Sequence, residues 1–198
     1  MSDFAQKFQV GQVAEGLIAT WLKARGNAIL PAYQIERATG KGPQLFSADG
    51  AFVAPDLLAF THDGVCWVEA KHKSVFTWHR MTSKWTTGID LRHYVEYLRV
   101  SWKTKYPVWL MFYHRESTPD RRDLEYGCPS ECPTGLFGGE LFRLVACENH
   151  RSLPYDKTRA GSTGHGRSGM VYWAVDSLRQ MASKEECEEA MDASRLIA

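Results

Sequence analysis

Residues 55–71 read PDLLAFTHDGVCWVEAK, two short apolar runs separated by a turn at 61–64. Both runs are rich in aromatic and β-branched residues, and Asp-Gly in the turn is a strong hairpin signal. We therefore expect two adjacent antiparallel strands here. Side chains alternate between the two faces of a strand, so Trp67, Glu69 and Lys71 should share one face of the second strand.

Two registers of this hairpin are open. A two-residue loop at Asp63-Gly64 places Asp56 opposite Lys71, whereas a four-residue loop over 61–64 places Asp56 opposite Glu69. Either register puts the two carboxylates and the lysine on one face at one end of the hairpin. Such a group is costly in an apolar setting unless a cation lies within it. The stretch therefore predicts a site for a divalent metal ion.

The flanking sequence predicts helices and strands in a definite order. Apolar periodicity indicates a helix over 8–25 that ends at Gly26, followed by a strand over 28–36 and a loop over 37–50. Strands are expected over 52–60, 65–71 and 108–113. Between the last two, TGID at 87–90 predicts a capping box that opens a helix with the apolar stripe Leu91, Tyr94, Val95, Leu98 and Trp102. A strand-helix-strand unit of this kind implies a parallel strand pair.

The second half of the chain is less regular. Proline, glycine and serine predict loops over 115–135 and 154–169, around a short segment at 140–146 of undetermined type. A strand is expected over 169–175, then a short helix capped by Asp176 and ending at Met181. The acidic run 185–189 predicts the solvated face of a last helix.

Pro55-Asp56, twelve intervening residues and Glu69-Ala70-Lys71 resemble the signature of the PD-(D/E)XK nucleases. This superfamily includes restriction endonucleases, Holliday junction resolvases and phage recombination exonucleases. The resemblance covers roughly residues 8–114 and the strand near 170–176, and it leaves 115–169 unexplained. It implies an α/β fold with a restriction endonuclease-like αβββαβ core, in which helices flank a central mixed β-sheet, with an irregular insertion near 115–169.

The resemblance also implies a function, Mg²⁺-dependent (or Mn²⁺-dependent) hydrolysis of DNA phosphodiester bonds, in a phage or DNA-repair setting. Asp56, Glu69 and the Ala70 carbonyl would hold the metal, and Lys71 would orient the attacking water or stabilise the phosphate. Glu15 matches a metal-site glutamate on the first core helix of many relatives. Its position on the helix flank by itself is typical of a solvated surface carboxylate.

Composition is consistent with an intracellular enzyme. The chain has 198 residues, of which 44% are apolar, which is enough for one domain over 1–198 with one core. The net charge of +1 leaves DNA contact to local patches. No run has the length of a membrane span and no signal peptide is visible, so we expect a soluble cytoplasmic protein. Five cysteines favour reduced thiols or metal ligands over a disulfide framework.

A basic stretch with interleaved aromatic residues follows the motif. Lys73, Arg80 and Lys84 lie among Trp78, His79 and Trp85, a mixture that suits phosphate contact combined with base stacking. The competing interpretation is a surface loop whose aromatic side chains reach the core.

Cys128 and Cys132 form a CxxxC pair, and Cys147 and His150 form a CxxH pair. Together they could build a tetrahedral Zn²⁺ site that stabilises the insertion. The competing interpretation is that Cys147 is a small buried residue and the other two are ordinary loop thiols.

Two alternatives to a general DNA nuclease remain. One is a resolvase or flap endonuclease, active as a homodimer and selective for branched DNA. The other is a nucleic-acid-binding module that keeps the fold without turnover. Retention of Asp56, Glu69 and Lys71 favours an active enzyme.

Overall fold

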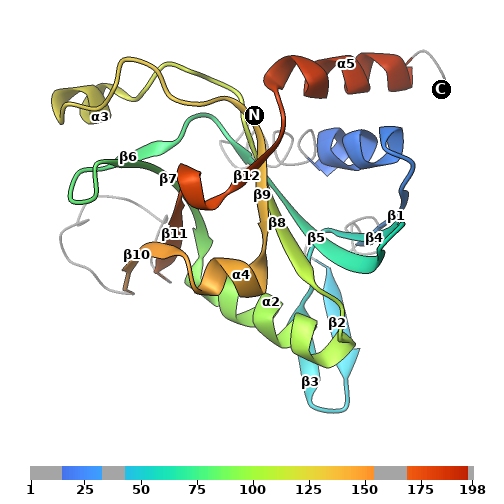
Figure 1. The fold of residues 1–198 in the computed structure, drawn as a ribbon. Coiled ribbons are helices and arrows are strands. Elements are labelled where there is room, and N and C mark those ends of the chain that lie inside the picture. The colour runs from blue at the N-terminus through green and yellow to red at the C-terminus, as the bar shows by residue number, and fades with distance from the viewer. Residues whose placement is uncertain (1–14, 33–42, 154–168, 196–198) are drawn as a thin grey trace, which may run out of the picture.

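A six-stranded mixed sheet forms the centre of the molecule (Figure 1). The computed structural model describes residues 15–32, 43–153 and 169–195. In hydrogen-bonding order the strands are β1 (Ala28–Pro31), β4 (Leu57–Thr61), β5 (Gly64–Lys73), β8 (Val108–His114), β9 (Gly135–Glu140) and β12 (Arg179–Ala182). β5 and β8 run parallel, and every other neighbouring pair in this sheet is antiparallel.

Helices cover both faces of this sheet, as expected for the α/β class. The first helix, described over 15–24, and α5 (Lys184–Arg195) lie on one face, and α2 (Leu91–Thr104) and α4 (Leu141–Val145) lie on the other (Figure 1). Alternate residues of β8 serve two separate cores. Leu110 and Phe112 pack on the α2 side, and Met111 and Tyr113 pack on the side of the first helix.

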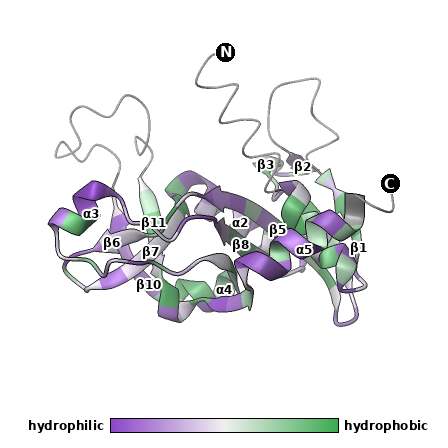
Figure 2. Ribbon diagram, turned by 90° about the horizontal axis from the view of Figure 1, so that it is seen from above, coloured by the Kyte–Doolittle hydropathy of each residue, from purple (hydrophilic) through white to green (hydrophobic). Residues whose placement is uncertain are grey.

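A smaller, four-stranded sheet stands beside the central one. Its order is β10 (Glu148–Ser152), β11 (Met170–Ala174), β7 (Lys84–Asp90) and β6 (Thr77–His79). Together with α3 (Arg121–Glu125) it occupies one end of the molecule, whereas α5 and β1 occupy the other (Figures 1 and 2). Figure 2 shows that the surface of α3 is mostly hydrophilic.

The first half of the chain contains more strands than the sequence suggested. Part of the predicted 37–50 loop forms β2 (Gln44–Ser47), which pairs with β3 (Gly50–Val53). This hairpin is held against α2, where Glu96 accepts a hydrogen bond from the Val53 backbone N–H. The predicted strand over 52–60 is therefore two strands, separated at 54–56. Of the strand expected over 28–36, β1 is described, and residues 33–42 lie outside the described part.

The basic stretch after the motif, for which a surface loop was one of two interpretations, forms the β6–β7 hairpin. The prediction of a capping box at 87–90 was wrong because these residues complete β7. Asp90 does cap α2, and its side chain accepts a hydrogen bond from the Arg92 backbone N–H. The predicted apolar stripe was correct in part. Tyr94 is buried, and Leu91 and Leu98 pack against the core, but Val95 and Trp102 are exposed, and Tyr97 and Val100 are buried in addition.

Part of the segment 115–169, expected to form an irregular insertion, belongs to the core of the fold. Its strand β9 lies within the central sheet between β8 and β12, a position that depends on close backbone approach. A Cβ atom added at Gly138 would lie 2.8 Å from the Leu110 carbonyl oxygen, so glycine is required there. The strand expected over 169–175 is present as β11, but it belongs to the smaller sheet.

The C-terminal prediction was correct in part. Asp176 lies in a 3-10 turn over Val175–Ser177, and the chain then enters β12 instead of the predicted helix. The last helix forms as expected, and Cys187 is its fully buried contact with the core. The first helix ends as predicted, at Gly26, whose φ of +81° is accessible to glycine. Among the described helices, none combines the length and apolarity needed to cross a bilayer.

Candidate active site

The hairpin β4–β5 sets the position of Asp56. Leu57 pairs with Val68, so Asp56 falls opposite Glu69 at the point where β4 begins. This is the second of the two registers considered above. Thr61 also pairs with Gly64, so the loop residues are His62 and Asp63.

Asp56 is held in place by the neighbouring strand. Its Oδ2 accepts a hydrogen bond of 3.0 Å from the Ala70 backbone N–H. This bond occupies a backbone donor beyond the last β4–β5 pair, which would otherwise lack a strand partner. The sequence therefore uses the aspartate to continue the ladder with a side chain.

The two carboxylates are nearly removed from solvent. Glu69 is 1% exposed and Asp56 is 9% exposed. Burial raises the pKa of Asp56 well above 3.8, and the nearby Glu69 charge raises it further, while Lys71 opposes the shift. In the protein alone, therefore, this pair of like charges is unfavourable at neutral pH.

Lys71 is the cationic member of the site. Its Nζ forms an ion pair with Glu69 Oε1, and its side chain is 32% exposed. Burial lowers the pKa of Lys71, but the charges of Glu69 and Asp56 outweigh that effect and raise it. Lys71 stays protonated at any physiological pH.

Glu15 is brought to the same neighbourhood from the first helix. Its negative charge raises the pKa of Asp56, although burial and Glu69 have larger effects. It also raises the pKa of Lys71, to which Glu69 and Asp56 contribute more. It does not complete a three-carboxylate cluster, because no three His, Cys, Asp or Glu side chains within 15–32, 43–153 and 169–195 gather closely enough to hold an ion. Asp56 and Glu69 thus form a pair, with Glu15 farther away.

Helix α2 contributes two side chains that were not among the predicted site residues. Tyr97 is 2% exposed, and its pKa is raised by burial first and then by the charges of Glu69 and Asp56. One turn earlier, His93 has a pKa lowered by burial and then by Lys71. The two rings are 5.8 Å apart. Residues four apart share a helix face, so the spacing of His93 and Tyr97 was the available signal. The predicted apolar stripe of this helix lay on a neighbouring face and included neither residue.

The predicted DNA-contacting residues have different surroundings. Lys73 continues β5 beyond Lys71, and burial and the Lys71 charge lower the pKa of Lys73 to about 8. Arg80 stacks its guanidinium on the ring of Tyr126. Lys84 is engaged in an ion pair with Asp176.

The four predicted zinc ligands are not drawn together in the structure. Cys132 is buried, and its Sγ donates a hydrogen bond to the Glu116 carbonyl oxygen. Cys147 is exposed, and His150 is stacked between two other rings. No metal-ligand cluster forms from them in the described part of the chain.

Comparisons with known proteins were made at the level of sequence and structure. No protein-family model and no curated protein sequence matches this chain. The solved structures similar to it include Hjc, a Holliday junction resolvase from Archaeoglobus fulgidus, with 9% identity and a TM-score of 0.45, over 91% of this chain and 95% of that one. Another is D212, a nuclease from a fusselovirus, with 10% identity and a TM-score of 0.38, over 98% and 94%. At such values the function has to be inferred from the site itself.

Proposed function

We propose that this chain is a metal-dependent nuclease that hydrolyses phosphodiester bonds of DNA. The observation that carries the proposal is the pairing of two buried carboxylates, Asp56 and Glu69, beside the ammonium group of Lys71, whose side chain is partly exposed. Buried like charges are unfavourable for stability, and such arrangements concentrate at active sites.

The residues present suit a hard divalent cation. Within the described residues neither Glu69 oxygen has a hydrogen bond of regular geometry, although the carboxylate lies against Lys71. Mg²⁺ and Mn²⁺ prefer oxygen ligands, and Mg²⁺ is commonly held by one or two carboxylates plus water and phosphate oxygens. Asp56 and Glu69 would hold the ion, with the Ala70 carbonyl as a further oxygen donor and Glu15 through water. A bound cation supplies an activated water and neutralises charge on the phosphate.

The protein's own groups position the reactants. The Ala70 N–H fixes the Asp56 carboxylate, which leaves its second oxygen, Oδ1, for a ligand. The buried Tyr97 on α2 lies near Glu69, whose charge raises the pKa of the Tyr97 hydroxyl. Lys71 places a permanent positive charge where negative charge would develop on the phosphate.

A cleavage assay tests the proposal. Purified wild-type protein and the Asp56→Asn variant are incubated with linear duplex, single-stranded and four-way-junction DNA and with RNA, each with and without Mg²⁺ or Mn²⁺. Wild type is expected to cut DNA only with metal, and Asp56→Asn is expected to cut nothing.

The matched control is Asp63→Asn, which changes an exposed acid in the turn of the same hairpin and should cut like wild type. Cleavage that survives Asp56→Asn, or a wild type that cuts no substrate with either metal, would refute the proposal. Preferential cutting of the four-way junction would place the activity among resolvases.

A further inference from the structure

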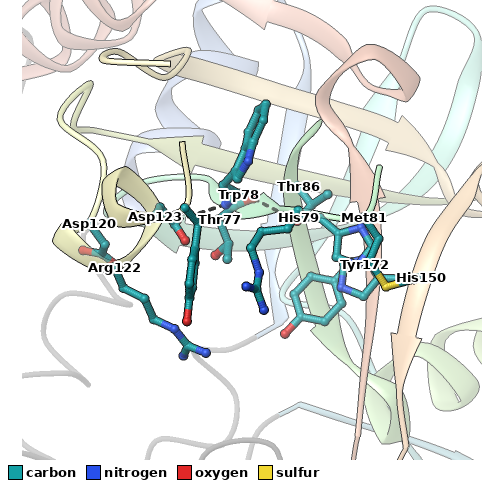
Figure 3. Close-up of a pocket in the computed structure, with 12 residues that line it drawn as sticks. Thr77, Trp78, His79, Met81, Thr86, Asp120, Arg122, Asp123, His150 and Tyr172 are labelled. Carbon is teal, nitrogen blue, oxygen red and sulfur yellow. Dashed lines mark hydrogen bonds between the residues drawn. The ribbon is translucent and has the colours of Figure 1, made fainter. Parts of the chain in front are cut away.

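A cavity of about 310 Å³ lies outside the active site, at the end of the molecule that the smaller sheet and α3 occupy (Figure 1). It is enclosed by the β6–β7 hairpin, α3 and the β10–β11 pair (Figure 3). We call it the aromatic pocket. Its volume is at the lower end of the roughly 300–1,000 Å³ typical of ligand pockets, which suits one nucleoside-sized molecule and excludes a duplex.

One wall of the pocket is a column of three parallel rings. His150 is stacked on His79, with centroids 3.8 Å apart and planes 7° apart, and on Tyr172, at 4.3 Å and 6°. Figure 3 shows these three side chains together on one side of the cavity. Flat rings at such spacings offer the surface on which a nucleobase stacks.

Hydrogen bonds hold the column in place before any ligand arrives. His79 Nδ1 is 2.8 Å from Thr82 Oγ1, which is 3.2 Å from the side-chain amide of Asn149. Asn149 Oδ1 in turn is 2.9 Å from His150 Nδ1. Because the rings are already fixed, a stacking ligand would not have to order them, and this reduces the entropic cost of binding.

The opposite wall carries charge suited to a phosphate. The guanidinium carbons of Arg80 and Arg122 lie 3.8 and 5.7 Å from the centroid of one ring, that of Tyr126. Within the described residues neither guanidinium is paired with a carboxylate, whereas two such cations in one place favour an anion. Asp123, the buried acid of this wall, accepts a hydrogen bond from the Trp78 backbone N–H, which ties α3 to β6.

The pocket is within reach of a DNA strand that crosses the active site. Lys71 precedes Thr77, the first pocket residue, by six positions, and six extended residues span at most about 20 Å. A strand whose scissile phosphate lies beside Lys71 could therefore place a nucleotide a few positions away in the pocket.

From these observations we infer that the aromatic pocket binds one unpaired nucleotide of the nucleic-acid substrate. The base stacks on the His79–His150–Tyr172 column, and Arg80 and Arg122 contact its phosphate. The inference rests on the proposed nuclease function for its choice of ligand. It assigns the substrate a single-stranded or flipped-out position beside the cleavage site.

The experiment measures binding in the Asp56→Asn protein with EDTA, so that DNA is not hydrolysed. The probes are a fluorescein-labelled 12-nucleotide single strand and the blunt duplex of the same sequence, and the readout is fluorescence anisotropy. Tyr172→Leu is expected to weaken single-strand binding about tenfold, in the range measured for loss of one stacked base, and to change duplex binding less than twofold. Tyr172→Phe keeps the ring and should bind the strand like the parent.

Two controls match the changes in the pocket. Trp102→Leu removes an exposed aromatic ring from the far end of α2 and should leave strand affinity within twofold. Arg80→Gln should lower the salt slope of strand binding by about one unit, whereas Arg179→Gln, on exposed β12, should not. If thermal melts show that Tyr172→Leu does not fold, His150→Ala replaces it, with the same expected loss.

The inference is overturned if the folded ring-deletion variant binds the strand as tightly as its parent, or loses strand and duplex affinity equally. Its failure is distinct from failure of the proposed function. A wild type that cuts DNA while strand binding ignores Tyr172 refutes the pocket alone. A protein that binds strands through Tyr172 but cuts nothing refutes the nuclease alone.

Discussion

Asp56 Oδ2 accepts a 3.0 Å hydrogen bond from the backbone N–H of Ala70, so the Asp56 side chain continues the β4–β5 ladder beyond its last backbone pair. The geometry of the site is thereby tied to the register of the sheet. A shift of one residue would break this bond and turn Glu69 and Lys71 to the opposite face. The predictions below separate this structural role of Asp56 from its proposed metal-binding role.

Asp56→Asn and Glu69→Gln should abolish Mg²⁺-dependent cleavage without unfolding the metal-free protein. The pKa of Asp56 is raised in the folded state, by burial and then by Glu69, so stability is lost as pH rises from 3.8 through the folded-state pKa. Removing this charge removes that penalty at neutral pH, and Asn retains an oxygen that can accept from Ala70. We expect the metal-free melting temperature of Asp56→Asn to equal or exceed that of wild type. The free energy of unfolding of Glu69→Gln should lie within about 1 kcal/mol of the wild-type value, because this variant also loses its pair with Lys71.

Thermal melts without metal and calorimetric titration with Mg²⁺ check both variants. A structural ion pair predicts the reverse result, with each substitution lowering metal-free stability and metal affinity unchanged. That outcome would remove these residues from the proposed metal site.

Lys71→Ala should lower the cleavage rate by about 10²–10³-fold, the usual cost of removing one group that stabilises charge in a transition state. Mg²⁺ binding should survive. Because Glu69 is 1% exposed and would lose its counter-charge, metal-free stability should fall by about 1–3 kcal/mol. Added Mg²⁺ should recover part of this loss, since the cation replaces the ammonium group beside Glu69.

Lys103→Ala serves as the control, because Lys103 forms a surface ion pair with Asp49 and its loss should cost less than about 1 kcal/mol. A Lys71→Ala protein that cuts DNA at the wild-type rate would exclude Lys71 from the reaction.

Replacing Lys73, Arg80 and Lys84 together by alanine should weaken DNA binding and flatten its salt dependence. Each lost phosphate contact lowers the slope by about one unit. Lys84 should contribute least as a single substitution, because its ammonium group is paired with Asp176. Affinities measured by anisotropy at several salt concentrations decide this, and an unchanged slope in the triple variant would return the segment to a structural role.

His114 should make the protein sensitive to acid. It is fully buried, stacked on Phe76 at 3.5 Å, and burial followed by the Lys73 charge lowers its pKa to about 3, with His72 adding to the shift. Between pH 6.5 and about 3 the unfolded state binds a proton at this residue that the folded state does not. Stability is therefore complete above pH 6.5 and falls as pH drops, by about 1.4 kcal/mol per pH unit.

His114→Phe keeps a ring in the stack and should remove this part of the slope. Urea unfolding at pH 7.0 and pH 5.0 compares the two proteins, with His62→Phe, in the exposed hairpin turn, as control. Equal pH dependence of wild type and His114→Phe would show that His114 is not the titrating group.

The sequence by itself determined the features that depend on near neighbours. The β4–β5 hairpin, the shared face of Glu69 and Lys71 and the stop at Gly26 all follow from local rules. Side-chain alternation has a period of two whatever the rest of the fold does. This is why the carboxylate pair and the lysine could be anticipated without coordinates.

Only the tertiary structure decided the rest. The place of β9 inside the central sheet and the face of α2 that carries Tyr97 depend on contacts between distant segments. The structure also chose between the two registers that the hairpin sequence left open. Hydrophobic burial is non-directional, so a helix with apolar side chains on several faces can turn any of them inward. The neighbouring sheet makes that choice, and here it selected Tyr97 over Trp102.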